Sequence, residues 1–190
     1  MGRWEPNARG RLEQAALELY GERGFDQTTV ADIAKRAGLT ERTFFRHFAD
    51  KREVLFWGEG GLHDVFVRSV VDAPEAMPPI DAVGSALEAA AGVFDGRRDI
   101  ARSRQAVIAA NPSLQERELI KLASLASGIA EALRSRGVSD PAASLTAEAG
   151  IAVFKVAFER WVDETNNEDL RLHIRESLAE LKAVTAGRNS

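Results

Sequence analysis

Two short helical segments joined by a tight turn, between residues 28 and 48, constrain the fold of this chain most strongly. Thr29 and Asp32 have the spacing of a capping box, in which two residues bond to each other's backbone at a helix start. Gly38 can adopt the positive φ that a tight turn needs, and Thr40 stands where the next helix cap is expected. This is the helix-turn-helix pattern, whose second helix enters the major groove of DNA.

The rest of the sequence is also helical, and no segment has the alternation that predicts a strand. A first helix carries an apolar stripe from Leu12 to Tyr20 and is expected to end at Gly24. Later boundaries are expected at Asp50 (the start of a long fourth helix), residues 78–80, residues 96–99, residues 111–116 with a second capping box at Ser113 and Glu116, residues 137–141, and residues 166–167. We therefore predict an all-α protein of about nine helices.

Charge is distributed unevenly along the 190 residues. Residues 1–56 contain 10 Lys and Arg against 9 Asp and Glu, whereas residues 57–190 contain 15 against 20. A local basic face can therefore bind phosphates although the net charge is −4. The absence of cysteine excludes disulfides and thiolate metal sites. Neither a signal peptide nor a run of 18 apolar residues is present, so we expect a cytoplasmic protein without membrane spans.

Two adjacent phenylalanines in the second of these short helices must face different ways, because neighbouring helical residues point about 100° apart. Phe44 and Phe48 are four residues apart and share the core-facing side with Leu39 and Leu55. Phe45 then lies on the polar side, between Arg42 and Arg46. It either packs under the two arginine stems or contacts a thymine methyl group or a sugar.

The segment TTVADIAKRAGLTERTFFRHFADKREVL (residues 28–55) resembles the DNA-binding signature of the tetracycline-repressor (TetR) family of bacterial transcription regulators. The resemblance implies a helix-turn-helix domain at residues 1–56 and a helical ligand-binding and dimerisation domain at residues 57–190. It also implies three partners: a palindromic double-stranded DNA operator, a second copy of the chain, and a small apolar or amphipathic effector. Repression relieved by the effector is the expected role, and activation is the alternative within the same family.

The resemblance also implies which residues contact DNA: phosphate contacts from Thr29, Thr43, His47 and Lys51, and base contacts from Thr40, Glu41, Arg42 and their groove-facing neighbours. The family usually has tyrosine where this chain has Phe45, so one hydroxyl contact to a phosphate is expected to be missing. Arg42 either contacts guanine in a bidentate manner or pairs with Glu41 or a phosphate. Arg46 is expected to meet a phosphate, and Glu41 to accept from cytosine or orient Arg42.

Two apolar stripes near the C-terminus have the spacing of helical bundles. The first is spaced 4-3-4-3 and consists of Ala147, Ile151, Phe154, Phe158 and Trp161. The second is spaced 4-4-3 and consists of Leu170, Ile174, Leu178 and Leu181. These residues either face the core of one protomer or form the dimer interface. The resemblance favours the interface, since the family dimerises through its last two long helices.

Bulky aromatic residues lie on several expected helices of the larger domain, and they are either core residues or the lining of an apolar ligand site. The candidate ligand-binding residues are Trp57, His63, Phe66, Phe94, Arg104, Phe154 and Phe158. The effector is expected to be lipophilic, an acyl thioester being one possibility. Gly60 and Gly61 are expected inside the fourth helix, where they indicate either a close helix contact or a hinge.

An enzyme is not expected, because no Gly-rich phosphate loop, GxSxG or HExxH motif is present. Glu59 and His63 have the i, i+4 spacing of a metal pair, but one such pair is a weak signal and an ordinary solvated ion pair is the favoured explanation. Neither a metal site nor a cofactor is predicted. The remaining alternative is a helical protein-interaction module that does not bind DNA.

Overall fold

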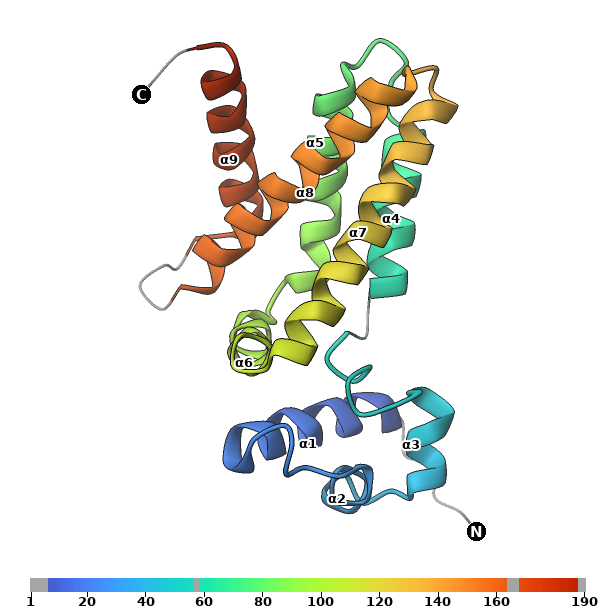
Figure 1. Cartoon of the computed structure of the whole chain (residues 1–190), viewed down its shortest axis with the longest axis vertical. Helices are drawn as coiled ribbons and strands as arrows, with labels where there is room; N and C mark the ends of the chain where they lie inside the picture. The colour runs from blue at the N-terminus through green and yellow to red at the C-terminus, as the bar shows by residue number, and fades with distance from the viewer. Residues whose placement is uncertain (1–6, 57–58, 164–167, 188–190) are drawn as a thin grey trace. The chain divides into compact units, whose positions relative to one another are not determined.

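The computed structural model describes residues 7–56, 59–163 and 168–187, and every regular element in these ranges is helical (Figure 1). The elements are α1 (Ala8–Arg23), α2 (Val30–Arg36), α3 (Glu41–His47), α4 (Glu59–Val71), α5 (Pro79–Ala91), the 3₁₀-helix η1 (Gly92–Phe94), α6 (Arg98–Ala109), α7 (Pro112–Ser135), α8 (Asp140–Val162) and α9 (Leu170–Thr185). The predicted all-α architecture is confirmed.

The chain forms two compact units, which we call the N-terminal and the C-terminal unit. The N-terminal unit comprises Met1–Trp57 and Arg102–Glu118, and the C-terminal unit comprises Gly58–Ala101 and Leu119–Ser190. The sequence-based division at residue 56 differs from this grouping in segment 102–118, which contains the end of α6 and the start of α7.

One apolar core holds the N-terminal unit together. Leu12, Leu19, Ile33 and Phe44 from the first three helices are fully buried in it. Val107, Ile108 and Leu114 from segment 102–118 belong to the same core. Burying each side chain of this kind stabilises the unit by about 1.5–3 kcal/mol.

The predicted caps around the helix-turn-helix turn are present. The hydroxyl of Thr29 accepts from the amide of Asp32, and the Asp32 carboxylate accepts from the amide of Thr29, so the capping box is closed. The hydroxyl of Thr40 accepts from the amide of Thr43 at the start of α3. Gly38 has φ 66°, and a Cβ at this position would lie 2.8 Å from a guanidinium nitrogen of Arg11. The turn therefore needs glycine for its backbone conformation, and the Arg11 side chain lies close against it.

The expected long fourth helix does not begin at Asp50. Asp50 does accept from the amides of Arg52 and Glu53, as a cap would. Residues 51–56 nevertheless form successive turns, in which the amide of Leu55 donates to the carbonyl of Arg52. A helix would need the carbonyl of Lys51 at this point, but that oxygen accepts from the hydroxyl of Tyr20 at 2.6 Å. The carbonyl of Lys51 therefore takes part in a tertiary hydrogen bond, and the amide of Leu55 bonds to the next carbonyl along the chain.

The expected capping box at Ser113 and Glu116 is wrong as well. α7 begins at Pro112, so Ser113 lies inside its first turn, and the carbonyl of Asn111 accepts the first helical amides. Proline favours the first helical position because its fixed φ suits a helix, and because a backbone N–H at this position would have no partner within the helix.

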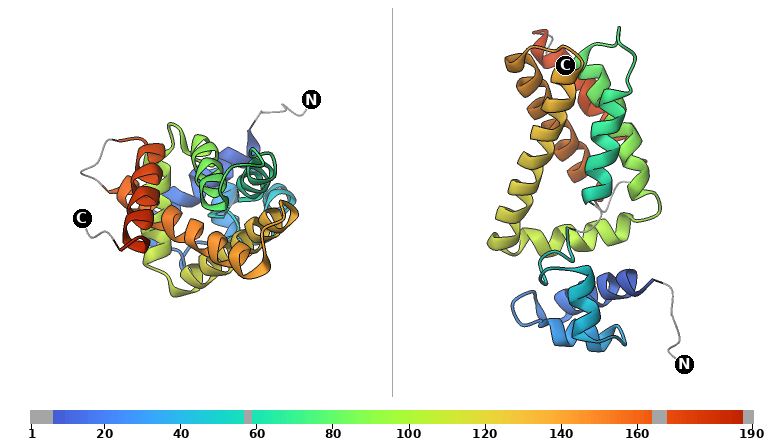
Figure 2. Two further views of the ribbon diagram at one scale, coloured as in Figure 1. Left: turned by 90° about the horizontal axis from the view of Figure 1, so that it is seen from above. Right: turned by 90° about the vertical axis from the view of Figure 1, so that its right-hand side faces the viewer.

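The C-terminal unit is a bundle, as the two views of Figure 2 show. α4 packs against α5, α5 against α8 and α9, and α8 against α9. α8 is long and apolar enough by length and composition to cross a membrane. Nine of its residues, from Ala143 to Trp161, are buried within the protein, and the core helix of a soluble protein passes the same test of length and composition.

Ion pairs and a close contact join α9 to α5 and to Asp95, the residue that follows η1. Asp95 binds Arg171, Glu88 binds Arg175 and Asp81 binds Lys182. Between these pairs, a methyl group of Leu178 lies 2.4 Å from where a Cβ of Gly84 would be. The charged pairs are partly exposed, so they orient α9 more than they stabilise it.

The glycine pair stands at the start of α4 rather than inside a longer helix, since α4 begins at Glu59. A Cβ at Gly61 would meet no atom within 4 Å, so a close contact at this residue does not explain the glycine. The hinge at Gly60 and Gly61 stays a prediction. Trp57, Gly58 and the boundary expected at residues 166–167 lie outside the described residues.

Candidate nucleic-acid interface

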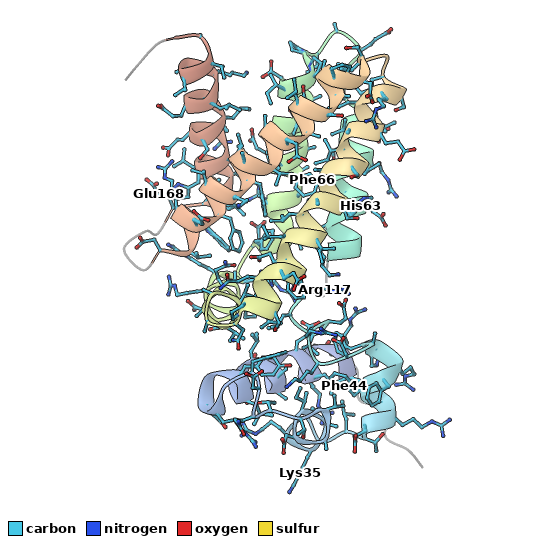
Figure 3. All side chains as sticks on the ribbon, in the orientation of Figure 1. Lys35, Phe44, His63, Phe66, Arg117 and Glu168 are labelled. Atoms are coloured by element: carbon cyan, nitrogen blue, oxygen red, sulfur yellow. The ribbon has the colours of Figure 1, made fainter. Side chains whose placement is uncertain are left out.

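The two adjacent phenylalanines of α3 have opposite environments. Phe44 is fully buried beside Phe48, with ring centroids 5.4 Å apart. Phe45 is 56% exposed and touches Phe44 edge-on, with centroids 5.5 Å apart. Phe44 therefore fixes α3 to the core of the N-terminal unit, as Figure 3 shows, while Phe45 presents an apolar surface to the outside.

Three exposed cations of the N-terminal unit keep their charge available. Within the described ranges, Lys35, Arg42 and Arg46 make no hydrogen bond and no ion pair. Arg42 does not pair with Glu41 among the described residues, so contact with guanine and contact with a phosphate both stay predictions for this arginine. Lys35 was not singled out from the sequence, and Figure 3 shows it projecting from α2. Its position on the side of α2 opposite Ile33 and Ala34 is the periodic signal that identifies it.

Other arginines of this unit are used within it. Arg36 binds the carboxylates of Glu18 and Glu22. A guanidinium nitrogen of Arg11 donates to the carbonyl of Ala37 at 2.5 Å, next to the turn glycine. The Arg9 guanidinium lies 5.3 Å from the ring centroid of Phe48. Arg36, Arg11 and Arg9 therefore serve the structure of the unit, whereas Arg42 and Arg46 can bind a partner outside it.

Two of the threonines that are predicted to contact DNA use their hydroxyls to cap helices. Thr29 caps α2 and Thr40 caps α3, and the hydroxyls of Thr40 and Thr43 are 3.0 Å apart. Each hydroxyl still has a free lone pair or proton with which it can bond to DNA. The roles of these threonines towards phosphates or bases stay predictions.

Lys51 has a role inside the protein that the sequence did not reveal. Its ammonium donates to the carbonyls of Phe25 at 2.8 Å and Thr28 at 2.9 Å. It also lies 4.3 Å from the ring centroid of Phe25. Lys51 therefore holds the loop between α1 and α2, and the phosphate contact implied for it stays a prediction that would compete with these bonds.

His47 is half-buried at the end of α3, and its Nε2 is enclosed without a hydrogen-bond partner. Burial lowers the pKa of the His47 imidazole below its ordinary 6.5, and the positive charges of Arg46 and Arg9 lower this pKa further. A nearby phosphate would instead favour the charged imidazolium and raise the pKa.

If His47 contacts a phosphate, DNA binding is expected to take up a proton. The operator affinity should rise as the pH falls through the pKa of His47 in the complex, and level off below its pKa in the free protein. Binding titrations between about pH 5 and pH 8 should show this dependence in the wild type and lose it in His47→Gln. Parallel pH profiles for the two proteins would remove His47 from the interface.

The candidate ligand residues fall into separate groups. Phe66, Phe94, Phe154 and Phe158 join Trp161 in one aromatic cluster of the C-terminal unit, with neighbouring ring centroids 5.5–6.3 Å apart. Arg104 belongs instead to the N-terminal unit, where it donates to the carbonyl of Leu55. That contact accounts for Arg104 without a ligand.

His63 lies on α4 against α7. A Cβ at Gly128 would be only 2.4 Å from the Nε2 atom of His63, so the imidazole occupies the space that this glycine leaves open. A role of His63 in ligand binding stays a prediction, as does that of Trp57, which lies outside the described residues.

The proposed dimer stripe of α8 faces the inside of a protomer. Ala147, Ile151, Phe154, Phe158 and Trp161 are all buried in the core of the C-terminal unit, together with Ile174 of α9. Leu178 and Leu181 of α9 are partly buried against the same core. This is the arrangement of the protomer-core alternative, which the spacing alone could not separate from an interface.

A second stripe of α8 points outwards. It consists of Leu145, Ala149, Ala152 and Val156, spaced 4-3-4, and we call it the outer stripe. Leu145 is 71% exposed and Val156 is 50% exposed. Large apolar side chains aligned on one exposed helix face are typical of a protein–protein contact.

Known protein families match both parts of the chain. Residues 13–56 match the family described as "Bacterial regulatory proteins, tetR family", and residues 77–186 match the "MftR C-terminal domain". The chain is 30% identical over 167 residues to MftR of Mycobacterium tuberculosis, a protein named for the regulation of mycofactocin biosynthesis. This alignment covers 85% of the chain and 83% of MftR.

A second relative is the transcriptional regulator TcmR of Streptomyces glaucescens, which is 37% identical over 89 residues. That likeness covers 46% of the chain and spans only 39% of TcmR. Both relatives are transcriptional regulators by name, and such proteins are not enzymes.

Solved structures show the same fold. FadR of Thermus thermophilus, a TetR-family transcriptional repressor in complex with lauroyl-CoA, is similar with a TM-score of 0.55 and 25% identity, over 96% of this chain and 95% of FadR. FadR of Bacillus subtilis in complex with stearoyl-CoA has a TM-score of 0.61 at 17% identity, over 90% of this chain and 96% of FadR. With more than half of its length matching the MftR C-terminal domain and its helix-turn-helix matching the tetR description, the chain belongs to the TetR family of bacterial transcription regulators.

Proposed function

We propose that this regulator binds a palindromic operator as a homodimer, represses transcription there, and leaves the DNA when a small, mostly apolar effector binds. The observation that carries the proposal is the exposed face of α3, where Phe45 stands between two arginines without protein partners. Phosphate contacts provide most of the affinity of such proteins for DNA, and contacts with base edges provide the specificity.

Each exposed residue of this face has a role under the proposal. Arg42, in the first turn of α3, reads a guanine, because the N-terminal residues of a recognition helix lead into the groove. Arg46 and Lys35 contact phosphates. Phe45 contacts a thymine methyl group or a sugar, and Glu41 accepts from a cytosine amino group or orients Arg42.

Replacing Arg42 by alanine tests the groove assignment. Operator affinity should fall by about 1–3 kcal/mol, and discrimination should be lost at one base pair of each half-site. The measurement is a set of salt-dependent gel shifts with DNA from upstream of the protein's own gene and with point variants of that site. Arg68→Ala, on α4, removes the same charge from an exposed arginine outside this face and serves as the control.

The gel shift also separates the rival functions. A helical protein-interaction module would show no salt-dependent complex with any DNA. Loss of affinity without any change in base preference in Arg42→Ala would place Arg42 on a phosphate. A reporter gene downstream of the bound site distinguishes repression from activation, because the outcome depends on where the operator lies.

We propose an acyl-CoA as the effector class. The aromatic cluster offers an apolar environment for an acyl chain, and the related FadR of Thermus thermophilus binds lauroyl-CoA. Adding lauroyl-CoA to the DNA complex should release the DNA and raise the melting temperature of the free protein, whereas CoA alone should do neither. An unchanged complex and melting temperature would exclude this class.

Cytoplasmic location follows from the same proposal, since an operator and an acyl-CoA are both found there. No cofactor is required, because binding and release of DNA involve no covalent chemistry.

A further inference from the structure

The turns at residues 51–56 are held from outside by two arginines of segment 102–118. The Nε of Arg104 donates to the carbonyl of Leu55 at 2.5 Å, and its guanidinium lies 5.1 Å from the ring centroid of Phe56. The same guanidinium binds Glu118 at 3.2 Å. Because the Arg104 side chain is only 22% exposed, its bonds are better shielded from water than those of a surface pair.

Arg117 makes the second attachment. Its Nε and Nη2 both donate to Oε1 of Glu53, at 2.9 Å and 2.5 Å. Figure 3 labels Arg117 on the first part of α7. Charge-assisted bonds of this kind are stronger and more directional than neutral ones. We call Arg104 and Arg117 together the arginine bracket.

The turns that the bracket holds carry the residues that fix the α1–α2 loop. The ammonium of Lys51 donates to the carbonyls of Phe25 and Thr28, and the carbonyl of Lys51 accepts from Tyr20. Thr28 is buried and immediately precedes Thr29, which caps α2. An unbroken series of hydrogen bonds and peptide links therefore runs from α6 and α7 to the start of α2.

We propose that the arginine bracket consists of two positioning residues for DNA binding, which set the α1–α2 loop and Thr29 through the turns at 51–56. This inference rests on the DNA-binding function proposed above. Amides within residues 51–56 bond the carbonyls of Arg52 and Glu53, whereas the carbonyls of Lys51 and Leu55 accept from side chains outside the segment, Tyr20 and Arg104. Arg104 supplies a donor to the carbonyl of Leu55, and Arg117 supplies donors to the carboxylate of Glu53, both from the part of the chain that the sequence assigned to the ligand domain.

The apolar core and the bracket can be separated by experiment. Val107, Ile108 and Leu114 hold segment 102–118 in the core without the arginines. Replacing an arginine by methionine keeps an unbranched apolar stem and removes only the donors and the charge. The variants Arg104→Met, Arg117→Met and the double variant should therefore fold.

The expected result for the double variant is faster amide hydrogen exchange at residues 25–29 and about tenfold weaker operator binding, the size of one charge-assisted hydrogen bond. The salt dependence of binding should fall by about one phosphate contact. Arg104→Lys should recover part of the affinity, because an ammonium can still donate to the carbonyl of Leu55. Arg134→Met is the control, since Arg134 pairs with Asp140 in the C-terminal unit.

Three outcomes decide the matter. Faster exchange at residues 25–29 with unchanged affinity and salt dependence would show that the bracket does not position the interface. Unchanged exchange would show that the contacts do not reach the loop. A wild-type protein that binds no DNA would overturn the proposed function instead, and the exchange measurement would still test the path.

Discussion

Replacing Phe44 by alanine is expected to lower the free energy of unfolding of the N-terminal unit by about 3–5 kcal/mol, because the ring is fully buried and its removal leaves a cavity. Phe45→Ala is the matched control on the next residue. It should change the unfolding free energy by less than about 0.5 kcal/mol, as surface substitutions do. Denaturant unfolding, monitored by exchange of amides in α1 and α2, measures both.

Phe45 should matter for DNA binding although it contributes little to the free energy of unfolding. At a temperature where all variants are folded, Phe45→Ala should weaken operator binding, and Phe45→Tyr should strengthen it by adding the hydroxyl that the family usually presents to a phosphate. Equal stability losses for Phe44→Ala and Phe45→Ala, or identical operator affinities for all residues tested at 45, would contradict the opposite assignments of the two rings.

Placing a charge on the outer stripe is expected to have the second large effect. Under the homodimer proposal, Val156→Asp buries a carboxylate in an apolar contact and should convert the dimer to monomers. Losing the link between two half-site contacts should reduce operator affinity by about 10²–10⁴-fold. Sedimentation or light scattering gives the association state, and gel shifts give the affinity.

Val71→Asp is the control for this prediction. Val71 ends α4, is 47% exposed, and lies outside the outer stripe, so the same substitution should leave the dimer and its DNA binding intact. A Val156→Asp protein that remains dimeric would place the interface elsewhere. Monomers that bind the operator as tightly as the wild type would show that dimerisation does not serve DNA binding.

Local chemistry made the helix-turn-helix predictable. The capping box at Thr29, the cap at Thr40 and the glycine turn depend on residues three or four apart, so spacing in the sequence is spacing in space. The opposite directions of Phe44 and Phe45 follow from helical geometry in the same way. The resemblance to the TetR family rested on this segment, and the family match to residues 13–56 agrees with it.

Predictions failed where distant residues compete for the same groups. The fourth helix was expected at Asp50, but Tyr20 takes the carbonyl of Lys51 and Arg104 takes that of Leu55. The protein partners of Arg104 were not foreseen either, because an arginine near apolar residues has no visible partner in the sequence, and its role in ligand binding stays a prediction. Its partners are 49 and 14 residues away.

The spacing of α8 could not say which of its two apolar faces is inside. The stripe that contains Phe154 and the outer stripe that contains Val156 have nearly the same period. Only the packing of α5 and α9 against α8 buries the first and leaves the second exposed.

The sequence by itself determined the all-α class, the helices and turn of residues 29–47, and the side of α3 that faces outwards, because periodicity and capping act within one or two helical turns. The tertiary structure alone decided which cations remain available, which face of α8 is exposed, and that segment 102–118 completes the N-terminal unit. Those properties depend on contacts between residues that are far apart in the sequence, and a local sequence pattern carries no information about such contacts.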